Sequence, residues 1–313
     1  MSNLVEVEQL VRYYGDYPAV QDVTFTLEKG EILGFLGPNG AGKTSTMQMI
    51  CGNLAPTSGQ VLIQGIDLLD RPREAKRELG YLPEIPPLYR ELTVDEFLSY
   101  CGRLHRMSRE QLHRALPEAK ERCGLQDVGA RLIGNLSKGF QQRVGIAQAI
   151  LHAPAVIILD EPTVGLDPIQ IREIRELIRE LGREHGIILS THILPEVQES
   201  CTHVQIIHRG QLVLKDTIDG LEQKMRASSI LLRTGRPGDP AKLAAVDGVQ
   251  SIEAIEATQL RIYHDNERNP AEQLAAVAVG EGWGLLELRP ERRSMEQVFI
   301  DITQQQPDEE YVA

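Results

Sequence analysis

The sequence has few cysteines, no long apolar run and fewer basic than acidic residues. Its cysteines, Cys51, Cys101, Cys123 and Cys201, are scattered without a C-x-x-C pair, which excludes zinc-finger spacing and favours reduced thiols. No stretch approaches the ~20 apolar residues that a transmembrane helix needs. The first residues, MSNLVEVEQL, lack the apolar segment of a signal peptide. We therefore expect any membrane pathway that this protein serves to be formed by another chain.

The shortage of basic residues bears on the class of partner. Lysine and arginine total 33 against 45 aspartate and glutamate residues, which gives a net charge of −12. Proteins that bind nucleic-acid duplexes usually carry a basic face, so no nucleic-acid partner is expected. An acidic chain can still bind nucleotide phosphates, because backbone N–H groups and one lysine are enough. Its 313 residues, 42% of them hydrophobic, suit two domains with ordinary cores.

Strand-like and helix-like segments alternate through the first two thirds of the chain. Buried strands are expected at Gly30–Leu36, Ala155–Asp160 and Gly186–Ser190, because these short runs are continuously apolar. A helix is expected over Ile169–Arg183, and residues 204–214 are expected to form a hairpin split by Arg209 and Gly210. Strands that alternate with helices predict an α/β core with a mixed sheet, over residues 1–218.

Two further segments interrupt or follow this core. Apolar residues recur at helical spacing over Val94–Leu104 and Leu112–Cys123, which predicts a helical subdomain at about residues 85–150. Residues 219–303 are expected to form an accessory domain with the order β-α-β-β-α-β, the ferredoxin-like split. A last helix is expected over Ser294–Thr303, and a disordered acidic tail over residues 304–313. The accessory elements are expected as strands Ser229–Arg233, Val249–Ala254, Gln259–Tyr263 and Gly284–Leu288 and helices Asp239–Val246 and Asn269–Gly280.

A glycine-rich motif is the most specific signal in the sequence. Gly37–Thr44 reads GPNGAGKT and matches G-x-x-x-x-G-K-[ST] in full, with an expected strand before it and a helix after it. Such a loop turns backbone N–H groups towards phosphates, Lys43 neutralises the β- and γ-phosphates, and the Thr44 hydroxyl can bind Mg²⁺. The candidate ATP-binding residues here are Gly37, Pro38, Asn39, Gly40, Ala41, Gly42, Lys43, Thr44 and Ser45.

Two acids end the apolar strand at Ala155–Asp160. The carboxyl edge of a parallel sheet is where α/β proteins bind ligands, so Asp160 and Glu161 are expected near the glycine-rich loop. Asp160 is a candidate Mg²⁺ ligand, and Glu161 is the candidate general base for the attacking water. Acids after strands are often merely solvated, and the nearby phosphate loop is what favours the catalytic interpretation.

The segment Leu136–Gln142, LSKGFQQ, resembles the signature LSGGQ of ABC ATPases in its LSKGxxQ variant. Other motifs of the family follow in order. Gly165–Asp167 resembles the D-loop, and Thr191-His192 resembles the switch histidine that contacts the γ-phosphate. Tyr14 resembles the aromatic residue that stacks on adenine, with Tyr13 as the alternative. The resemblance covers roughly Met1–Thr217 and implies the ABC ATPase fold with ATP and Mg²⁺ as its cofactors.

The resemblance also implies a dimer. In the family the signature covers the γ-phosphate of ATP held by the opposite subunit, which here assigns Ser137, Gly139 and Gln141 to the partner's nucleotide. Asp167 would link the two sites. The chain has one phosphate loop and one signature, so it needs a second copy or a related ATPase subunit to complete two composite sites.

One position departs from the family pattern. The family usually has glutamine where this chain has Glu84, in the segment GYLPE. A carboxylate there could approach Mg²⁺ directly or through water, so Glu84 is a third candidate metal ligand.

The resemblance favours the ATPase subunit of an ABC-2 type exporter that pairs with separately encoded permeases. Such a protein is peripheral, at the cytoplasmic face of the inner or plasma membrane, and Leu88–Tyr100 would face the permease. The alternative is a non-transport ABC ATPase that acts on the ribosome or on DNA. Such proteins carry two ATPase domains, long coiled coils or zinc modules, and the sequence shows none of these. A membrane protein encoded beside this chain would favour transport.

Overall fold

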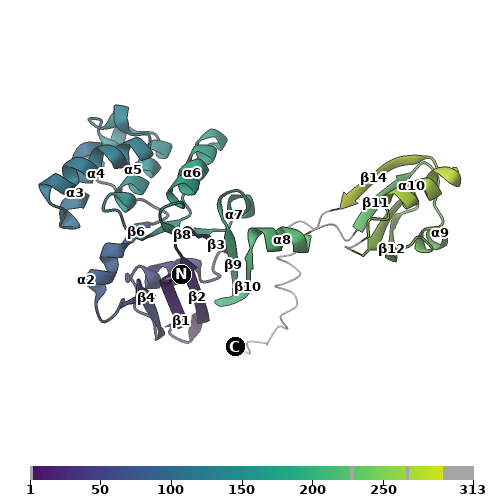
Figure 1. The fold of residues 1–313 in the computed structure, drawn as a ribbon, viewed down its shortest axis with the longest axis horizontal. Coiled ribbons are helices and arrows are strands. Elements are labelled where there is room, and N and C mark those ends of the chain that lie inside the picture. Colours follow the sequence, from purple (N-terminus) through teal and green to yellow (C-terminus); the bar gives the residue numbers. More distant parts are fainter. Residues whose placement is uncertain (1–2, 226–228, 266–267, 292–313) are drawn as a thin grey trace. The chain divides into compact units, whose positions relative to one another are not determined.

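The computed structural model describes residues 3–225, 229–265 and 268–291. The chain divides into two compact units, Met1–Ile218 and Asp219–Ala313 (Figure 1). Each unit has its own hydrophobic core.

The first unit is centred on a six-stranded sheet with the order β10-β9-β3-β8-β7-β6. All neighbours are parallel except the hairpin β9–β10. The three strands expected from apolar runs are confirmed, and every residue of β3, β7 and β8 is buried. The strands are β3 Ile32–Leu36, β6 Leu79–Leu82, β7 Val156–Asp160, β8 Gly186–Thr191, β9 His203–His208 and β10 Gln211–Thr217.

A second, antiparallel sheet of the first unit has the order β2-β1-β4-β5. Its strands are β1 Asn3–Tyr14, β2 Tyr17–Glu28, β4 Ser58–Ile63 and β5 Ile66–Asp67. The sequence patterns did not predict this sheet. The register of β1 on β2 shifts between Val7 and Leu10 and again between Leu10 and Arg12. Such bulges break the alternation of apolar and polar residues by which a strand is recognised.

The helical subdomain expected near residues 85–150 corresponds to α3, α4 and α5, which lie between β6 and β7 in sequence. The three helices lie side by side (Figure 1). Thr93 and Ser108 begin α3 and α4 with capping boxes to Glu96 and Gln111. No helix in the described ranges is long and apolar enough to cross a bilayer. The helices of the unit are α1 Lys43–Ile50, α2 Pro72–Ala75, α3 Val94–Leu104, α4 Arg109–Arg122, α5 Lys138–Ile150, α6 Pro168–Leu181 and α7 Leu194–Ser200, with short 3-10 turns at Lys76–Glu78, Gln126–Val128 and Ile133–Asn135.

The second unit contains a four-stranded antiparallel sheet with the order β12-β13-β11-β14. The expected order of strands and helices is confirmed. Buried residues of strands β11 and β13 and of helices α9 and α10 pack with Trp283 into one core. The helix expected over Ser294–Thr303 and the tail over residues 304–313 lie outside the described residues. After α8 Ile218–Met225, the elements are β11 Ser229–Thr234, α9 Pro240–Ala244, β12 Val249–Glu256, β13 Gln259–His264, α10 Ala271–Gly280 and β14 Leu285–Glu291.

Candidate functional site

The glycine-rich loop joins β3 to α1 and packs closely on neighbouring backbone. A Cβ atom at Gly37 would collide with the carbonyl oxygen of Ile207, and one at Gly42 would collide with that of Ala19. Gly42 also has a φ of 104°, which favours glycine. Since the first N–H groups of a helix have no partner within it, the start of α1 offers donors to an anion.

Lys43 lies across this loop. Its Nζ donates hydrogen bonds to the carbonyl oxygens of Gly37 at 2.8 Å and Pro38 at 3.2 Å. Burial lowers the pKa of Lys43, while the charges of Glu161, Asp160 and Glu84 raise it in opposition. The lysine therefore lies between the loop and a group of acids whose charges favour its protonated form.

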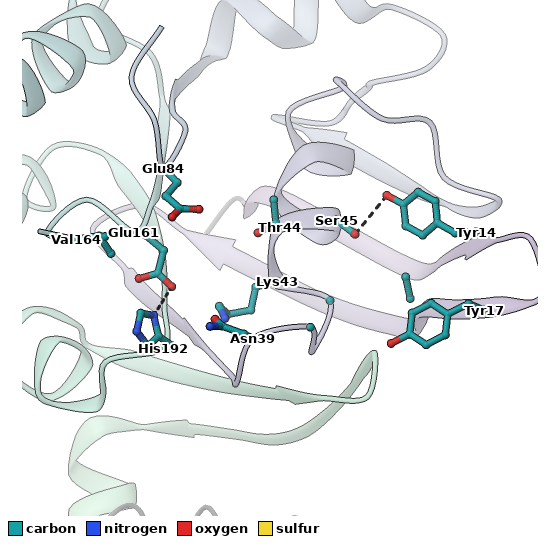
Figure 2. Close-up of a pocket in the computed structure, with 13 residues that line it drawn as sticks. Tyr14, Tyr17, Asn39, Lys43, Thr44, Ser45, Glu84, Glu161, Val164 and His192 are labelled. Atoms are coloured by element: carbon teal, nitrogen blue, oxygen red, sulfur yellow. Dashed lines mark hydrogen bonds and ion pairs between the residues drawn. The ribbon is translucent and has the colours of Figure 1, made fainter. Parts of the chain in front are cut away.

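The loop forms the floor of a pocket of about 410 Å³ (Figure 2). Tyr14 and Tyr17 lie at one end of the pocket, and Glu161 and His192 lie at the other, with Lys43 between them. The lining residues are Tyr14, Tyr17, Ala19, Asn39, Gly40, Gly42, Lys43, Thr44, Ser45, Glu84, Glu161, Val164 and His192.

The acid end of the pocket is built by the carboxyl ends of three neighbouring parallel strands. Glu161 follows β7, His192 follows β8 and Glu84 comes shortly after β6. The Nδ1 atom of His192 lies 2.8 Å from Oε1 of Glu161, and it donates because a carboxylate only accepts. Glu161 is buried and has a φ of 49°, a conformation that is uncommon for a residue with a side chain. Its backbone N–H donates to the carbonyl of Ser190 at 2.8 Å.

Asp160 is the last residue of β7, next to Glu161 in sequence, and is almost fully buried. Its Oδ1 atom has no hydrogen-bond partner among the described residues. Burial raises the pKa of Asp160 and the charges of Glu161 and Glu84 raise it further, while Ser190 and the charge of Lys43 lower it. A cation at this end of the pocket would compensate the buried carboxylate. The described residues contain no group of three His, Cys, Asp or Glu side chains arranged to hold a metal by themselves, so a ligand would have to complete the coordination.

The tyrosine end comes from the hairpin between β1 and β2. The Tyr14 hydroxyl lies 3.4 Å from Oγ of Ser45, and the Arg12 guanidinium lies 4.9 Å from the centre of the Tyr14 ring. Tyr13 does not line the pocket. Tyr17, which pairs with Tyr14 across the turn, was not predicted from the sequence. The dipeptide Gly15-Asp16 between two apolar segments is a hairpin signal that could have placed it there.

The signature residues are not among those that line the pocket. Ser137 caps α5, where its Oγ accepts a hydrogen bond from the Phe140 N–H at 3.4 Å. Gly139 packs against the side chain of Gln170. Gln141 donates from Nε2 to the carbonyl oxygens of Leu136 at 3.0 Å and of Ile133 at 3.2 Å, which ties the segment to its own subunit. Ser137 is exposed and thus accessible to another molecule.

The D-loop candidate lies beside the signature. Asp167 caps α6, with Oδ1 accepting the N–H groups of Ile169 and Gln170 at 3.0 Å each. Nζ of Lys138 fills the position where a side chain at Gly165 would begin. Gly165 also has a φ of 72°, which favours glycine. The two motifs contact each other within one chain.

A buried acid that contacts Thr163 and Thr191 was not predicted from the sequence. Glu196 on α7 is 1% exposed, and its carboxylate accepts hydrogen bonds from the hydroxyls of Thr163 and Thr191. Thr163 follows Glu161 closely in sequence, and Thr191 precedes His192. No sequence signal marks Glu196, because a glutamate on a short polar helix is usually solvated.

Comparisons with known proteins agree on one family. The family model described as ABC transporter matches residues 20–164. The chain is 40% identical to the bacitracin transport ATP-binding protein BcrA of Bacillus licheniformis over 228 residues, 72% of this chain and 74% of that protein. It is 29% identical to the linearmycin resistance ATP-binding protein LnrL of Bacillus subtilis over 306 residues, 96% and 98% of the two chains. A solved structure of an ATP-binding subunit of an ABC transporter matches with a TM-score of 0.64 and 36% identity, over 71% of this chain and 92% of that chain.

Proposed function

This chain belongs to the ATP-binding proteins of ABC transporters, which hydrolyse ATP to power transport, and we propose that the pocket between Tyr14 and Glu161 is its MgATP site. The observation that carries the proposal is the hydrogen-bonded pair of Glu161 and His192 facing Lys43 across the pocket. This arrangement provides a base and a phosphate-binding cation within one pocket.

The nucleotide is held along the length of the pocket. Residues 37–45 bind the phosphates through the N–H groups of the loop, the start of α1 and the Lys43 ammonium. Tyr14 stacks on the adenine, an interaction worth about 1–3 kcal/mol by analogy with bases stacked on aromatic side chains in nucleic-acid complexes. The proximity of Tyr14 to Ser45 of the loop supports this placement.

Mg²⁺ fits the acid end of the site. The buried Oδ1 of Asp160 lacks a hydrogen-bond partner among the described residues, and carboxylate and hydroxyl oxygens are suitable ligands for this ion. Thr44, Asp160 and Glu84 would hold it together with the phosphates. When bound, Mg²⁺ neutralises charge on the phosphates.

Hydrolysis is assigned to Glu161 and its neighbours. Glu161 takes a proton from the attacking water while the water oxygen bonds to the γ-phosphorus and the bond to ADP breaks. His192 orients Glu161 through the 2.8 Å hydrogen bond and faces the γ-phosphate. Lys43 stabilises the charge that develops on the transferred group.

The complete site requires a second ATPase subunit. Ser137 and Gly139 lie outside the pocket of their own chain, and Ser137 is exposed at the start of α5. In the proposed dimer they cover the γ-phosphate of the partner's nucleotide. Gln141 supports the segment through its hydrogen bonds to Ile133 and Leu136, and Asp167 links the two sites.

The transport partner is an integral membrane permease encoded separately. Relatives named for bacitracin transport and linearmycin resistance support an exporter of the ABC-2 type that acts on antibiotics or drugs. Within Leu88–Tyr100, Tyr89 and Tyr100 are exposed and in edge contact, with ring centres 5.6 Å apart. This segment is proposed to face the permease, with the protein peripheral at the cytoplasmic face of the membrane.

The two units are assigned as an ATPase domain, residues 1–218, and an accessory domain, residues 219–303. The sheet order β12-β13-β11-β14 with every pair antiparallel supports a ferredoxin-like fold for the accessory domain.

Replacement of Glu161 by Gln tests the proposed function. The variant keeps its shape but lacks the base, so we expect turnover to fall by about 10²- to 10⁴-fold while MgATP holds the chain as a dimer. Light scattering after size-exclusion chromatography would measure the dimer. Glu176→Gln, an exposed acid of α6, is the control and should hydrolyse ATP normally. A Glu161→Gln protein that stays monomeric in saturating MgATP, or that turns over normally, contradicts the proposal.

A further inference from the structure

Glu196 is a buried acid without a role in the hydrolysis described above. It lies on α7, four residues after His192, and is 1% exposed. An ionised carboxylate in such a position is costly unless hydrogen bonds or opposite charges compensate it. Two hydroxyls do so here. Thr163 Oγ1 donates to Oε1 of Glu196, and Thr191 Oγ1 donates to Oε2 at 2.8 Å.

Thr191 stands between Glu196 and the proposed base. Its Oγ1 lies 2.8 Å from Oε2 of Glu196 and 3.3 Å from Oε2 of Glu161. It also accepts the N–H of Ile193 at 3.0 Å. A hydroxyl has one hydrogen and can donate to only one of the two carboxylates. The shorter distance assigns that hydrogen to Glu196.

Glu161 therefore has one bonded and one free oxygen. Oε1 accepts from Nδ1 of His192, and Oε2 faces the Thr191 oxygen without receiving its hydrogen. A hydrogen bond donated to a carboxylate stabilises the charged form and lowers its basicity. Oε2 of Glu161 is thus the more basic oxygen as long as Thr191 donates to Glu196.

We propose that Glu196 is a positioning residue for ATP hydrolysis, which draws the Thr191 hydrogen to itself and so leaves Oε2 of Glu161 free to accept the proton of the attacking water. The inference rests on the proposed role of Glu161 as base. It gives the buried acid on α7 a part in the reaction without contact to the nucleotide.

The protonation state of Glu196 controls this arrangement. Burial raises the pKa of Glu196, the Thr191 hydrogen bond and Arg175 of α6 lower it, Glu161 raises it, and His192 lowers it. When Glu196 binds a proton, it becomes a weaker acceptor than the Glu161 carboxylate. The Thr191 hydroxyl then donates its hydrogen to Glu161 instead. We therefore expect the acid side of the pH profile of kcat to contain the titration of Glu196.

The first test is Glu196→Gln in the full chain. The amide of glutamine can donate to the Thr191 oxygen, so the hydroxyl turns to Glu161 and weakens the base. We expect kcat to fall about tenfold or more, the KM for ATP to stay within about twofold of wild type, and the acid limb of the kcat profile to move to lower pH. Glu176→Gln, whose side chain has no ion pair among the described residues, should match wild type. Thermal unfolding and ATP binding show whether each variant is folded.

Two further variants separate a positioning role of Glu196 from a loss of activity that is caused by a disturbed structure. Thr163→Val removes one hydrogen bond from ionised Glu196 without touching Glu161, so activity should be lost at a higher pH than in wild type. In a Thr191→Val background no hydroxyl can turn, so Glu196→Gln should move the acid limb less than it does in wild type, through the loss of the Glu196 charge alone.

The outcomes are distinguishable. A Glu196→Gln enzyme with the kcat and pH profile of wild type, or one with an equal shift in the Thr191→Val background, overturns the inference. Should Glu196→Gln fail to fold, an unchanged acid limb in Thr163→Val overturns it instead. Normal hydrolysis by Glu161→Gln would refute the proposed function itself, whatever the Glu196 variants show.

Discussion

Lys43 makes its hydrogen bonds with the glycine-rich loop to which it belongs. Its ammonium donates to the carbonyl oxygens of Gly37 and Pro38, and burial lowers its pKa. A triphosphate offers stronger, charged acceptors than these carbonyls. The lysine can therefore exchange neutral partners for anionic ones when a nucleotide binds. Its contribution to affinity is the difference in free energy between its hydrogen bonds to the phosphates and those to the carbonyl oxygens.

Lys43→Ala is expected to weaken ATP binding by about 10- to 100-fold, because a hydrogen bond to a charged group is worth about 1.5–3 kcal/mol. Titration with a fluorescent ATP analogue would measure the change. Lys29→Ala removes an exposed lysine outside the pocket and outside the motifs and serves as the control for the loss of one charge. Unchanged affinity in Lys43→Ala would mean that the loop does not hold the phosphates.

At this scale, contiguous motifs were predictable and isolated residues were not. The loop, Glu161 and His192 were identified because each occurs within a recognisable segment, and the structure brings them into one pocket. Tyr17 and Glu196 are single residues whose positions depend on pairing or packing. Tyr17 reaches the pocket only through the register of β1 on β2, and Glu196 reaches Thr191 only through the packing of α7.

Among the elements, continuous apolar runs predicted the central strands well. β3, β7 and β8 are buried on both faces, so composition alone identifies them. The sheet of β1, β2, β4 and β5 was missed because bulges disturb its alternation. Contacts between elements also depend on tertiary packing and could not be predicted from the sequence. The stacked rings of His105 and His152 are an example.

His105 and His152 connect three elements of the first unit. Their rings stack with centres 3.8 Å apart, at the ends of α3 and α5, and Nε2 of His152 lies 3.0 Å from the carbonyl oxygen of Leu79 in β6. Burial and, to a smaller extent, the neighbouring His105 lower the pKa of His152 to about 4. The ring is neutral and donates from Nε2 in the folded protein at neutral pH.

The first unit is expected to lose stability as the pH falls from about 6.5 towards 4. Unfolded His152 binds a proton near pH 6.5 and folded His152 only near pH 4, so acid favours the unfolded chain in that window. The free energy of unfolding should fall by about 2 kcal/mol between pH 7 and pH 5 from this residue. Urea unfolding of wild type and His152→Gln would measure it. Equal pH dependence in the two proteins would contradict the assignment.

For the whole molecule, the proposed ATP site has parts that one chain cannot bring together. The pocket lacks the signature, and the signature lies at an exposed helix start that contacts its own D-loop. Each chain would therefore contribute half of two sites, so hydrolysis should depend on pairs of subunits.

A mixing experiment tests this dependence. Ser137→Arg is expected to bind ATP normally but to block the partner's site, and Lys43→Ala to lose its own site. Mixed in equal amounts, they should form hybrid dimers with one intact site and recover about a quarter of wild-type activity if the sites act independently. Each variant alone should be inactive. Normal hydrolysis by Ser137→Arg alone, or no recovery in verified hybrid dimers, would rule out shared sites.

The aromatic end of the pocket has a consequence for nucleotide choice. Tyr14, backed by Arg12, offers a flat surface, and adenine and guanine differ at their edges rather than their faces. Binding at the phosphate end, by contrast, depends on the number of negative charges that the nucleotide carries. This protein should therefore distinguish triphosphates from diphosphates far better than it distinguishes one purine from the other. The abundance of ATP in the cell, more than the shape of the pocket, would then determine which nucleotide it hydrolyses.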